Sequence, residues 1–178
     1  MGFYNFAVMS VTLPPVLDAW RMVSSQRRFE GTLPLAAMPR LKQVLMDVEG
    51  DCRYELDFVR DPLGHNVLRV RVKAALPLQC QRSLERFLYP VSVDQALGLI
   101  KDEAQEASLP EGMEAVLVDE DGELHPADLI EDELLLAVPV VPINPDAPEI
   151  APQWADELDE PEEKPNPFIA LAALRDRK

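Results

Sequence analysis

Hydrophobic and polar residues alternate along residues 52–59 and again along residues 68–74. Neighbouring side chains of a strand point to opposite faces of a sheet, so this alternation predicts two strands that each bury one face. Residues 61–64, Asp-Pro-Leu-Gly, lie between the two runs and favour a turn. We therefore expect an antiparallel pair of strands with one buried and one exposed face.

Further strands and helices are predicted around this pair. Apolar runs predict three additional strands, at 26–33, 86–93 and 113–118. Apolar residues at helical spacing predict three helices, at 14–23, 35–45 and 128–138. The last has an Asp128-x-x-Glu131 capping pattern at its start and Pro139 after its end. The expected fold class is α+β: an antiparallel twisted sheet or partly closed barrel of about five or six strands flanked by short helices.

Proline and acidic residues become frequent towards the C-terminus. The chain has 178 residues, which suits one domain with a tail. We expect an α+β domain at 1–142, an acidic, Pro-rich linker at 143–165 and a short C-terminal helix at 166–178. Asn166 suits the N-cap of that helix and Pro167 its first turn.

Charge is distributed unevenly along the chain. The chain has 32 acidic and 17 basic residues, and its net charge is −15. Residues 1–90 contain 12 basic and 9 acidic side chains, whereas residues 91–178 contain 5 basic and 23 acidic ones. This asymmetry favours a polar partner or an acidic tail that covers something basic, and the alternative is that the acidity only maintains solubility.

The same sequence favours a cytoplasmic protein. No apolar run approaches the roughly 20 residues that cross a bilayer. The N-terminal residues contain no Lys or Arg, so we expect no signal peptide, and Met9 is an alternative start. The two cysteines, Cys52 and Cys80, cannot form a disulfide framework, and a reducing compartment is the simpler interpretation. The oligomeric state is left open.

No arrangement of residues predicts catalysis. His65 and His125 are far apart in the sequence, and motifs for phosphate binding, nucleophilic catalysis or a metalloprotease are missing from it. The acidic run 131–133 is interpreted as a solvated feature of a helix start rather than a magnesium site. Because Ser83 follows Cys80 where a second cysteine would make a C-x-x-C pair, Cys80 is predicted to be a single buried thiol near the sheet edge. We expect no catalytic residue, no cofactor and no metal.

Three segments occur in an order that is typical of a known family. They are Leu-Gln-Cys-Gln-Arg-Ser-Leu at 78–84, the helix and prolines at 128–142, and Lys-Pro-Asn-Pro-Phe-Ile-Ala-Leu-Ala-Ala-Leu at 164–174. The chain resembles the bacterial YceD family, the large ribosomal RNA subunit accumulation proteins, from about Met9 onwards, and Phe29-Glu30-Gly31 also fits. The resemblance implies a role in synthesis, processing or accumulation of 23S rRNA, and hence in assembly of the large subunit.

The chain departs from the pattern of this family at candidate metal ligands. The family commonly has C-x-R-C-L where this chain has Ser83 as the fourth residue, and often has His where Asn144 stands, with a Cys shortly after. Only Cys80 of these candidate ligands is present. This departure supports the expectation of no metal.

Two hypotheses follow for a non-catalytic factor. The first is contact with the large-subunit rRNA precursor through a cationic stripe, because alternate residues of a strand share one face. The candidates for RNA binding are Arg53, Arg69, Arg71, Lys73 and Arg82. The alternative for these residues is an ordinary solvated face that is partly paired with Glu55 and Asp57.

The second hypothesis is an acidic adaptor or chaperone that binds a basic ribosomal protein. A flexible acidic tether that leads to a short hydrophobic helix could dock in a groove of such a partner. The candidates for protein docking are Lys164, Pro165, Asn166, Pro167, Phe168, Leu171 and Leu174. The alternative is that this segment packs on its own domain.

Overall fold

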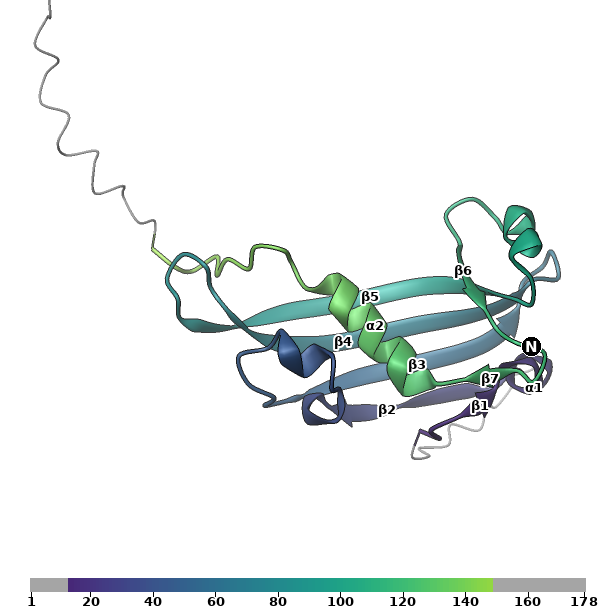
Figure 1. The fold of residues 1–178 in the computed structure, drawn as a ribbon, viewed down its shortest axis with the longest axis horizontal. Helices are drawn as coiled ribbons and strands as arrows, with labels where there is room; N and C mark the ends of the chain where they lie inside the picture. The colour runs from purple at the N-terminus through teal and green to yellow at the C-terminus, as the bar shows by residue number, and fades with distance from the viewer. Residues whose placement is uncertain (1–12, 149–178) are drawn as a thin grey trace, which may run out of the picture. The chain divides into compact units, whose positions relative to one another are not determined.

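The structure is a computed structural model that describes residues 13–148. Its main feature is a five-stranded sheet in the order β2-β3-β4-β5-β6 (Figure 1). The strands are β2 (Arg28–Pro34), β3 (Asp51–Arg60), β4 (Asn66–Gln79), β5 (Arg86–Ile100) and β6 (Glu114–Leu117). A separate two-stranded sheet joins β1 (Leu17–Asp18) to β7 (Glu123–Leu124). The helices are α1 (Ala19–Ser24), α2 (Pro126–Ala137) and the 3-10 turns η1 (Leu35–Ala37), η2 (Leu41–Gln43) and η3 (Glu103–Ser108).

The predicted α+β fold with a twisted sheet is confirmed, and the sheet is open rather than closed into a barrel. Strands β3 and β4 form the predicted antiparallel pair, in which Glu55 lies opposite Arg71. Strands β2 and β5 extend the sheet in antiparallel fashion on either side. Strand β6 instead runs parallel to β5. Parallel neighbours need a crossover, which residues 101–113 provide with η3.

The core lies between one face of the sheet and α2, which crosses that face (Figure 1). Alternate residues of β3 and β4, such as Leu56, Phe58 and Val70, point into it and are fully buried. Ile130 and Leu134 of α2 meet them from the other side and are also fully buried. Burial of each such side chain contributes roughly 1.5–3 kcal/mol, which explains why the alternation in the sequence determines the face that is covered.

The helix predicted at 35–45 is wrong. The segment contains η1 and η2, which are separated by an extended Met38 with φ −109° and ψ 94°. Met38 precedes Pro39, and the proline ring disfavours helical backbone angles at the residue before it. The apolar spacing nevertheless has a structural role, since Leu35, Met38 and Leu41 are all buried.

The helices predicted at 14–23 and 128–138 are both present, but each begins at another residue than predicted. Helix α1 begins at Ala19 because the Asp18 carboxylate accepts a hydrogen bond from the Arg21 N–H at 2.9 Å and caps it. Helix α2 begins at Pro126, so Asp128 lies in its first turn and is not the N-cap that the capping pattern predicts. Proline is favoured at this first position because no intrahelical partner exists there for an N–H.

The predicted division of the C-terminal region falls mostly beyond the described residues. The first compact unit of the chain ends at Asp146, and no helix or strand occurs between Val138 and that residue. Most of the predicted linker and all of the predicted helix at 166–178 lie outside the described part. Within residues 13–148, no helix is long and apolar enough to cross a membrane.

Candidate functional site

The open face of the sheet comprises the side chains of β2–β5 that point away from α2. Its charged members are Arg28, Glu30, Asp51, Arg53, Glu55, Asp57, Arg69, Arg71, Lys73, Arg86 and Asp94. The cross-strand register places them in rows, so that each charge has neighbours on the adjacent strands. Six of them are cations and five are carboxylates, so this face has a formal net charge of only +1.

Two arginines of the open face are held in a network of ion pairs. Arg71 Nη1 lies 2.9 Å from Glu55 Oε2 and 3.5 Å from Asp57 Oδ2, and its Nε lies 3.5 Å from Asp94. Arg28 contacts the same Glu55 and Asp57 at 3.0 and 3.5 Å. The hydrogen bond to Glu55 raises the pKa of Arg71. Arg71 is therefore paired with Glu55 and Asp57, and it would have to give up these partners to bind a phosphate.

The remaining predicted cations lie in two places. Arg53, Arg69 and Lys73 are exposed on the open face, and none forms an ion pair with another described residue. Arg53 lies directly opposite Lys73 in the register, so these two positive charges are adjacent. Arg82 lies in the turn between β4 and β5, where its Nη2 donates to Asn144 O at 3.3 Å. The structure thus brings four of the five predicted residues to one face and places Arg82 apart from them.

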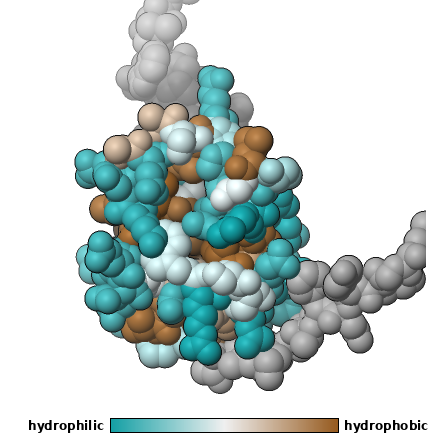
Figure 2. Space-filling view, turned by 90° about the vertical axis from the view of Figure 1, so that its right-hand side faces the viewer, coloured by the Kyte–Doolittle hydropathy of each residue, from teal (hydrophilic) through white to brown (hydrophobic). Residues whose placement is uncertain are grey.

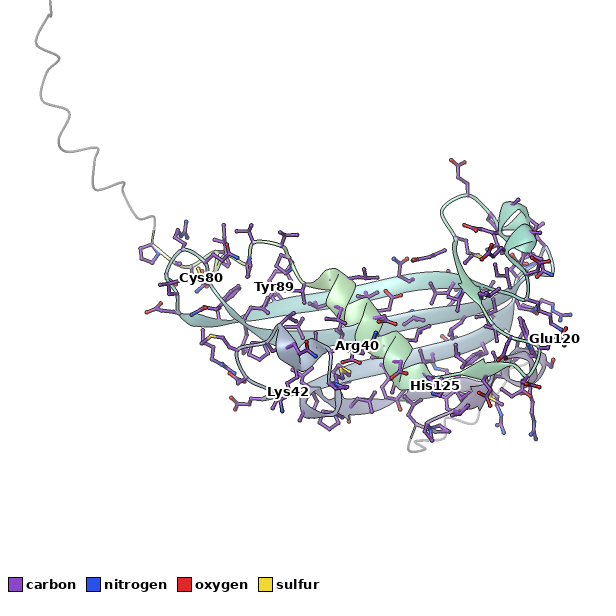
Figure 3. The ribbon with its side chains drawn as sticks, in the orientation of Figure 1. Arg40, Lys42, Cys80, Tyr89, Glu120 and His125 are labelled. Carbon is purple, nitrogen blue, oxygen red and sulfur yellow. The ribbon has the colours of Figure 1, made fainter. Side chains whose placement is uncertain are left out.

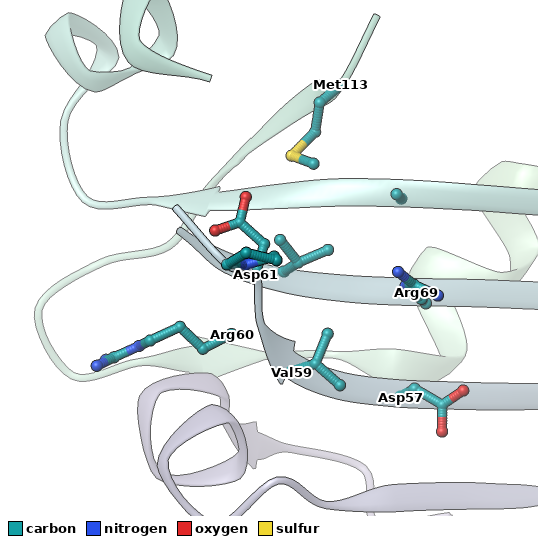
Figure 4. A pocket seen from close by; sticks show the side chains of 9 residues that line it. Asp57, Val59, Arg60, Asp61, Arg69 and Met113 are labelled. Carbon is teal, nitrogen blue, oxygen red and sulfur yellow. The ribbon is translucent and has the colours of Figure 1, made fainter. Parts of the chain in front are cut away.

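A shallow hollow of about 350 Å³ lies at one end of the open face (Figure 4). Asp57 and Arg69 line it from neighbouring strands, and Asp61 lines it from the β3–β4 turn. The Asp61 carboxylate is bound to His65 Nδ1 at 2.7 Å. The residues that line this hollow include no Ser, Cys or His that could serve as a nucleophile or base.

Cys80 occupies the turn at the opposite end of the domain from Glu120 (Figure 3). It is a buried free thiol directly after β4, as predicted. Its Sγ accepts backbone N–H groups of Ser83 at 3.4 Å and of Asn144 at 3.3 Å. A hydrogen bond from the Ser83 side chain, followed by these backbone bonds, lowers the pKa of Cys80 to about 6, whereas burial raises that of Cys52 to about 11. Sequence reasoning missed this polar setting because Asn144 is distant in the chain.

The structure brings Ser83 and Asn144 into contact with the Cys80 sulfur. At these two positions the family resemblance expects metal ligands, Cys and His, which this chain does not have. Among residues 13–148, no group of three or more His, Cys, Asp or Glu side chains is placed to hold a metal ion. A single thiolate is a poor match for zinc, which takes four ligands in structural sites. The residues present at Cys80 do not fit such a site.

The end of the domain that carries η3 and the β6–β7 turn is strongly acidic. Residues 101–123 contain nine acidic side chains and one basic side chain, Lys101, whose Nζ lies 5.1 Å from the centre of the Trp20 ring. Figure 1 shows both loops at one end of the sheet, and Figure 2 views that end, whose surface is mainly hydrophilic. We call residues 101–123 the acidic end. Residues 13–148 contain 24 acidic and 13 basic residues, so the folded domain, rather than the tail, holds most of the acidic excess.

The acidic run on α2 is not the solvated feature that was expected. Glu131 is 2% exposed, and its carboxylate accepts hydrogen bonds from Arg40 N at 2.6 Å, Leu41 N at 2.9 Å and Arg40 Nε at 3.0 Å. Asp132 is exposed and also contacts the Arg40 guanidinium. Glu133 is 7% exposed, and burial, followed by the charges of Glu114 and Asp132, raises its pKa. Arg40 and Leu41 lie 90–92 residues away from these carboxylates in the sequence, which explains why the local pattern did not reveal them.

The seven predicted protein-docking residues at 164–174 lie outside the described part of the chain.

Comparison with known proteins bears on the whole chain. The family profile described as "Large ribosomal RNA subunit accumulation protein YceD" matches residues 68–175. The chain is 30% identical over 173 residues to the Large ribosomal RNA subunit accumulation protein YceD of Haemophilus influenzae, and this alignment covers 95% of the chain and 97% of that relative. No solved structure matches the chain. The chain belongs to the YceD family of large ribosomal RNA subunit accumulation proteins.

Proposed function

We propose that this protein is a non-catalytic, cytoplasmic factor that supports accumulation of 23S rRNA by binding a basic ribosomal protein of the large subunit. The family and its named relative support the connection to large-subunit rRNA. The observation that carries the choice of partner is the acidic end, where nine carboxylates and one ammonium group are held on a folded domain. Such a field attracts a cationic protein and repels RNA phosphates.

The charge of the open face also favours a protein partner. Binding of RNA derives much of its strength from Lys and Arg side chains that release counterions from phosphates. The six cations of the open face stand among five carboxylates; Arg28 and Arg71 are engaged by these carboxylates, and Arg86 is engaged by Asp47 and Glu49. A basic protein meets no such obstacle at the acidic end, because Lys101 is the one cation there.

The test is capture of partners by tagged full-length protein from growing cells, with and without ribonuclease. A basic large-subunit protein should remain bound after ribonuclease treatment. Its recovery should fall when five carboxylates of the acidic end are neutralised to Gln or Asn, at Glu103, Glu106, Glu111, Glu120 and Asp121. A matched variant neutralises five carboxylates of the tail, at Glu157, Asp159, Glu160, Glu162 and Glu163. Loss of all partners on ribonuclease treatment, or equal effects of the two variants, would contradict the proposal.

A second candidate is direct RNA contact through the open face. It is favoured by the three exposed cations Arg53, Arg69 and Lys73, two of which are adjacent. If they bind phosphates, the affinity for large-subunit rRNA should fall steeply with salt, and Arg53→Gln with Lys73→Gln should reduce that salt dependence by about two counterions. Arg21→Gln on α1 is the control. Affinity that stays constant between low and moderate salt would exclude this mode.

A further inference from the structure

One side of β5 has no strand beside it for most of its length. Strand β5 pairs with β4 from Arg86 to Gly98, but it pairs with β6 only from Leu97 to Ile100. Within the described part of the chain, residues 86–96 therefore form a free sheet edge. Long free edges act as templates for another strand, and proteins usually protect them with charged side chains, proline or bulges.

The hydrogen bonds of the sheet identify the backbone groups at this edge. The Met46 N–H donates to Pro77 O at 2.8 Å, so the carbonyl of Pro77 points away from β5. In an antiparallel pair, residues opposite each other both turn their N–H and C=O groups towards the partner or both turn them away. Leu88 lies opposite Pro77, and its backbone groups therefore face the open side. By the same alternation, free N–H groups are also expected at Ser92 and Asp94, whereas Pro90 offers only its carbonyl.

The side chains of this edge suit pairing rather than protection. Residues 86–96, Arg-Phe-Leu-Tyr-Pro-Val-Ser-Val-Asp-Gln-Ala, contain two charged residues, Arg86 at the start and Asp94, and the seven residues between them are uncharged. Aromatic and β-branched residues are favoured in strands. Leu88 is 53% exposed, and Pro90 is the only protective residue type of this edge besides the charged Arg86 and Asp94.

Unpaired carboxylates lie where this edge meets β6. Glu114, the first residue of β6, lies opposite Leu97, immediately after the free stretch. Glu133 of α2 is close enough to Glu114 for the charge of Glu114 to raise its pKa. Neither carboxylate forms an ion pair or a hydrogen bond with another residue of the range 13–148; Glu133 is 7% exposed as a residue, and its carboxylate oxygens keep contact with solvent. Partial desolvation and the neighbouring negative charge both disfavour the ionised form of Glu133, so a cation brought by a ligand would be favoured here.

We infer that the free edge of β5 binds an extended, basic segment of a partner protein as an added strand along residues 88–96, with a Lys or Arg of that segment beside Glu114 and Glu133. This inference rests on the proposed function, in which the partner is a basic ribosomal protein. Main-chain hydrogen bonds would supply affinity, and the carboxylates would select the cationic sequence. A second copy of the chain fits less well. Two-fold pairing centred on Ser92 would bring Arg86 to this position, but Arg86 is held by Asp47 at 2.6 Å.

The test uses full-length protein and a fluorescent peptide of alternating Lys and Val, read by anisotropy. Ser92→Pro removes an outward N–H without touching the β4 ladder and should weaken binding at least about tenfold. Thr32→Pro on the other edge strand, β2, is the matched control and should leave binding unchanged. Glu133→Gln should weaken binding of this peptide, and a peptide of alternating Glu and Val should not bind. Thermal unfolding checks that each variant is folded.

Amide hydrogen exchange gives a readout that does not depend on any variant. The amides of Leu88, Ser92 and Asp94 should exchange rapidly in the free protein and slow at least about tenfold when the peptide is bound. Absence of peptide binding, unchanged binding by Ser92→Pro, unchanged exchange at these amides, or self-association through this edge would overturn the inference. If Ser92→Pro still captures the basic ribosomal protein as well as the native chain does, only this docking mode fails. If the native chain captures none, the proposed function fails.

Discussion

The carboxylate of Glu131 fixes α2 to the segment that connects β2 and β3. It accepts three N–H groups, two of them from the backbone of Arg40 and Leu41 and one from the Arg40 side chain. The Glu131 side chain is 2% exposed, so water cannot replace a lost partner without a rearrangement. Glu131→Ala would therefore leave two backbone donors and a guanidinium group without their acceptor.

The size of this effect follows from the burial. Loss of one partner of a buried charged pair costs about 3–5 kcal/mol, whereas loss of an exposed ion pair costs about 0–1 kcal/mol. We expect Glu131→Ala to lower the free energy of unfolding by about 3–5 kcal/mol, a large part of the roughly 5–15 kcal/mol typical of a domain. Glu131→Gln retains one acceptor oxygen, and we expect a loss of about 1.5–3 kcal/mol. Asp132→Ala is the control, because Asp132 contacts the same Arg40 but is 54% exposed.

Urea denaturation followed by fluorescence of Trp20 measures these differences. The midpoint should fall in the order Asp132→Ala, Glu131→Gln, Glu131→Ala, while the slope of the free energy against urea stays constant. A constant slope would show that native stability, rather than the compactness of the unfolded chain, has changed. If Glu131→Ala costs no more than Asp132→Ala, the buried bonds do not hold α2 in place, and the reasoning is refuted.

Three further outcomes are expected. The ultraviolet absorbance of the thiolate should titrate at Cys80 with a pKa of about 6, and Ser83→Ala should raise that pKa. Gly31→Ala should lower the free energy of unfolding by about 1–3 kcal/mol, because a Cβ there would lie 2.7 Å from the Tyr54 hydroxyl oxygen. The raised pKa of Glu133 favours its protonated form in the folded state, so its contribution is full below the unfolded pKa and is lost as pH rises through the folded pKa. In urea denaturation at a series of pH values, Glu133→Gln should therefore gain stability relative to the native chain as pH rises.

The sheet could be predicted from the sequence because its signal is local. Residues of β3 and β4 alternate every second position, and the same alternation decides which face packs on α2. The segment 35–45 shows the limit of this approach. Its apolar residues are indeed buried, but Pro39 excludes the continuous helix that their spacing suggests. The parallel direction of β6 was also beyond a local pattern, since it depends on the path of the crossover.

The candidate sites depended on partners that are distant in the sequence. Alternation alone places Arg69, Arg71 and Lys73 on one face, but it does not tell that carboxylates of β3 and β5 engage Arg71 and no described carboxylate engages the other two. Likewise, an acidic run at the start of a helix is usually solvated, and only the approach of Arg40 explains why Glu131 is buried. The free edge of β5 results from the absence of a neighbouring strand within residues 13–148, and no residue pattern encodes such an absence directly.

A protein with an acidic domain can assist accumulation of RNA without touching it. Basic proteins bind nucleic acid non-specifically through counterion release, so an unoccupied ribosomal protein would also bind the wrong RNA. Carboxylates of the acidic end would compete with phosphates for the same Lys and Arg side chains, and this part of the interaction must weaken with salt as RNA binding does. A strand added to β5 would depend on main-chain hydrogen bonds that salt hardly screens. Under the proposed mechanism, raising the salt concentration should therefore release the wrong RNA before it releases the factor, and transfer to rRNA would require that the correct site displace the added strand.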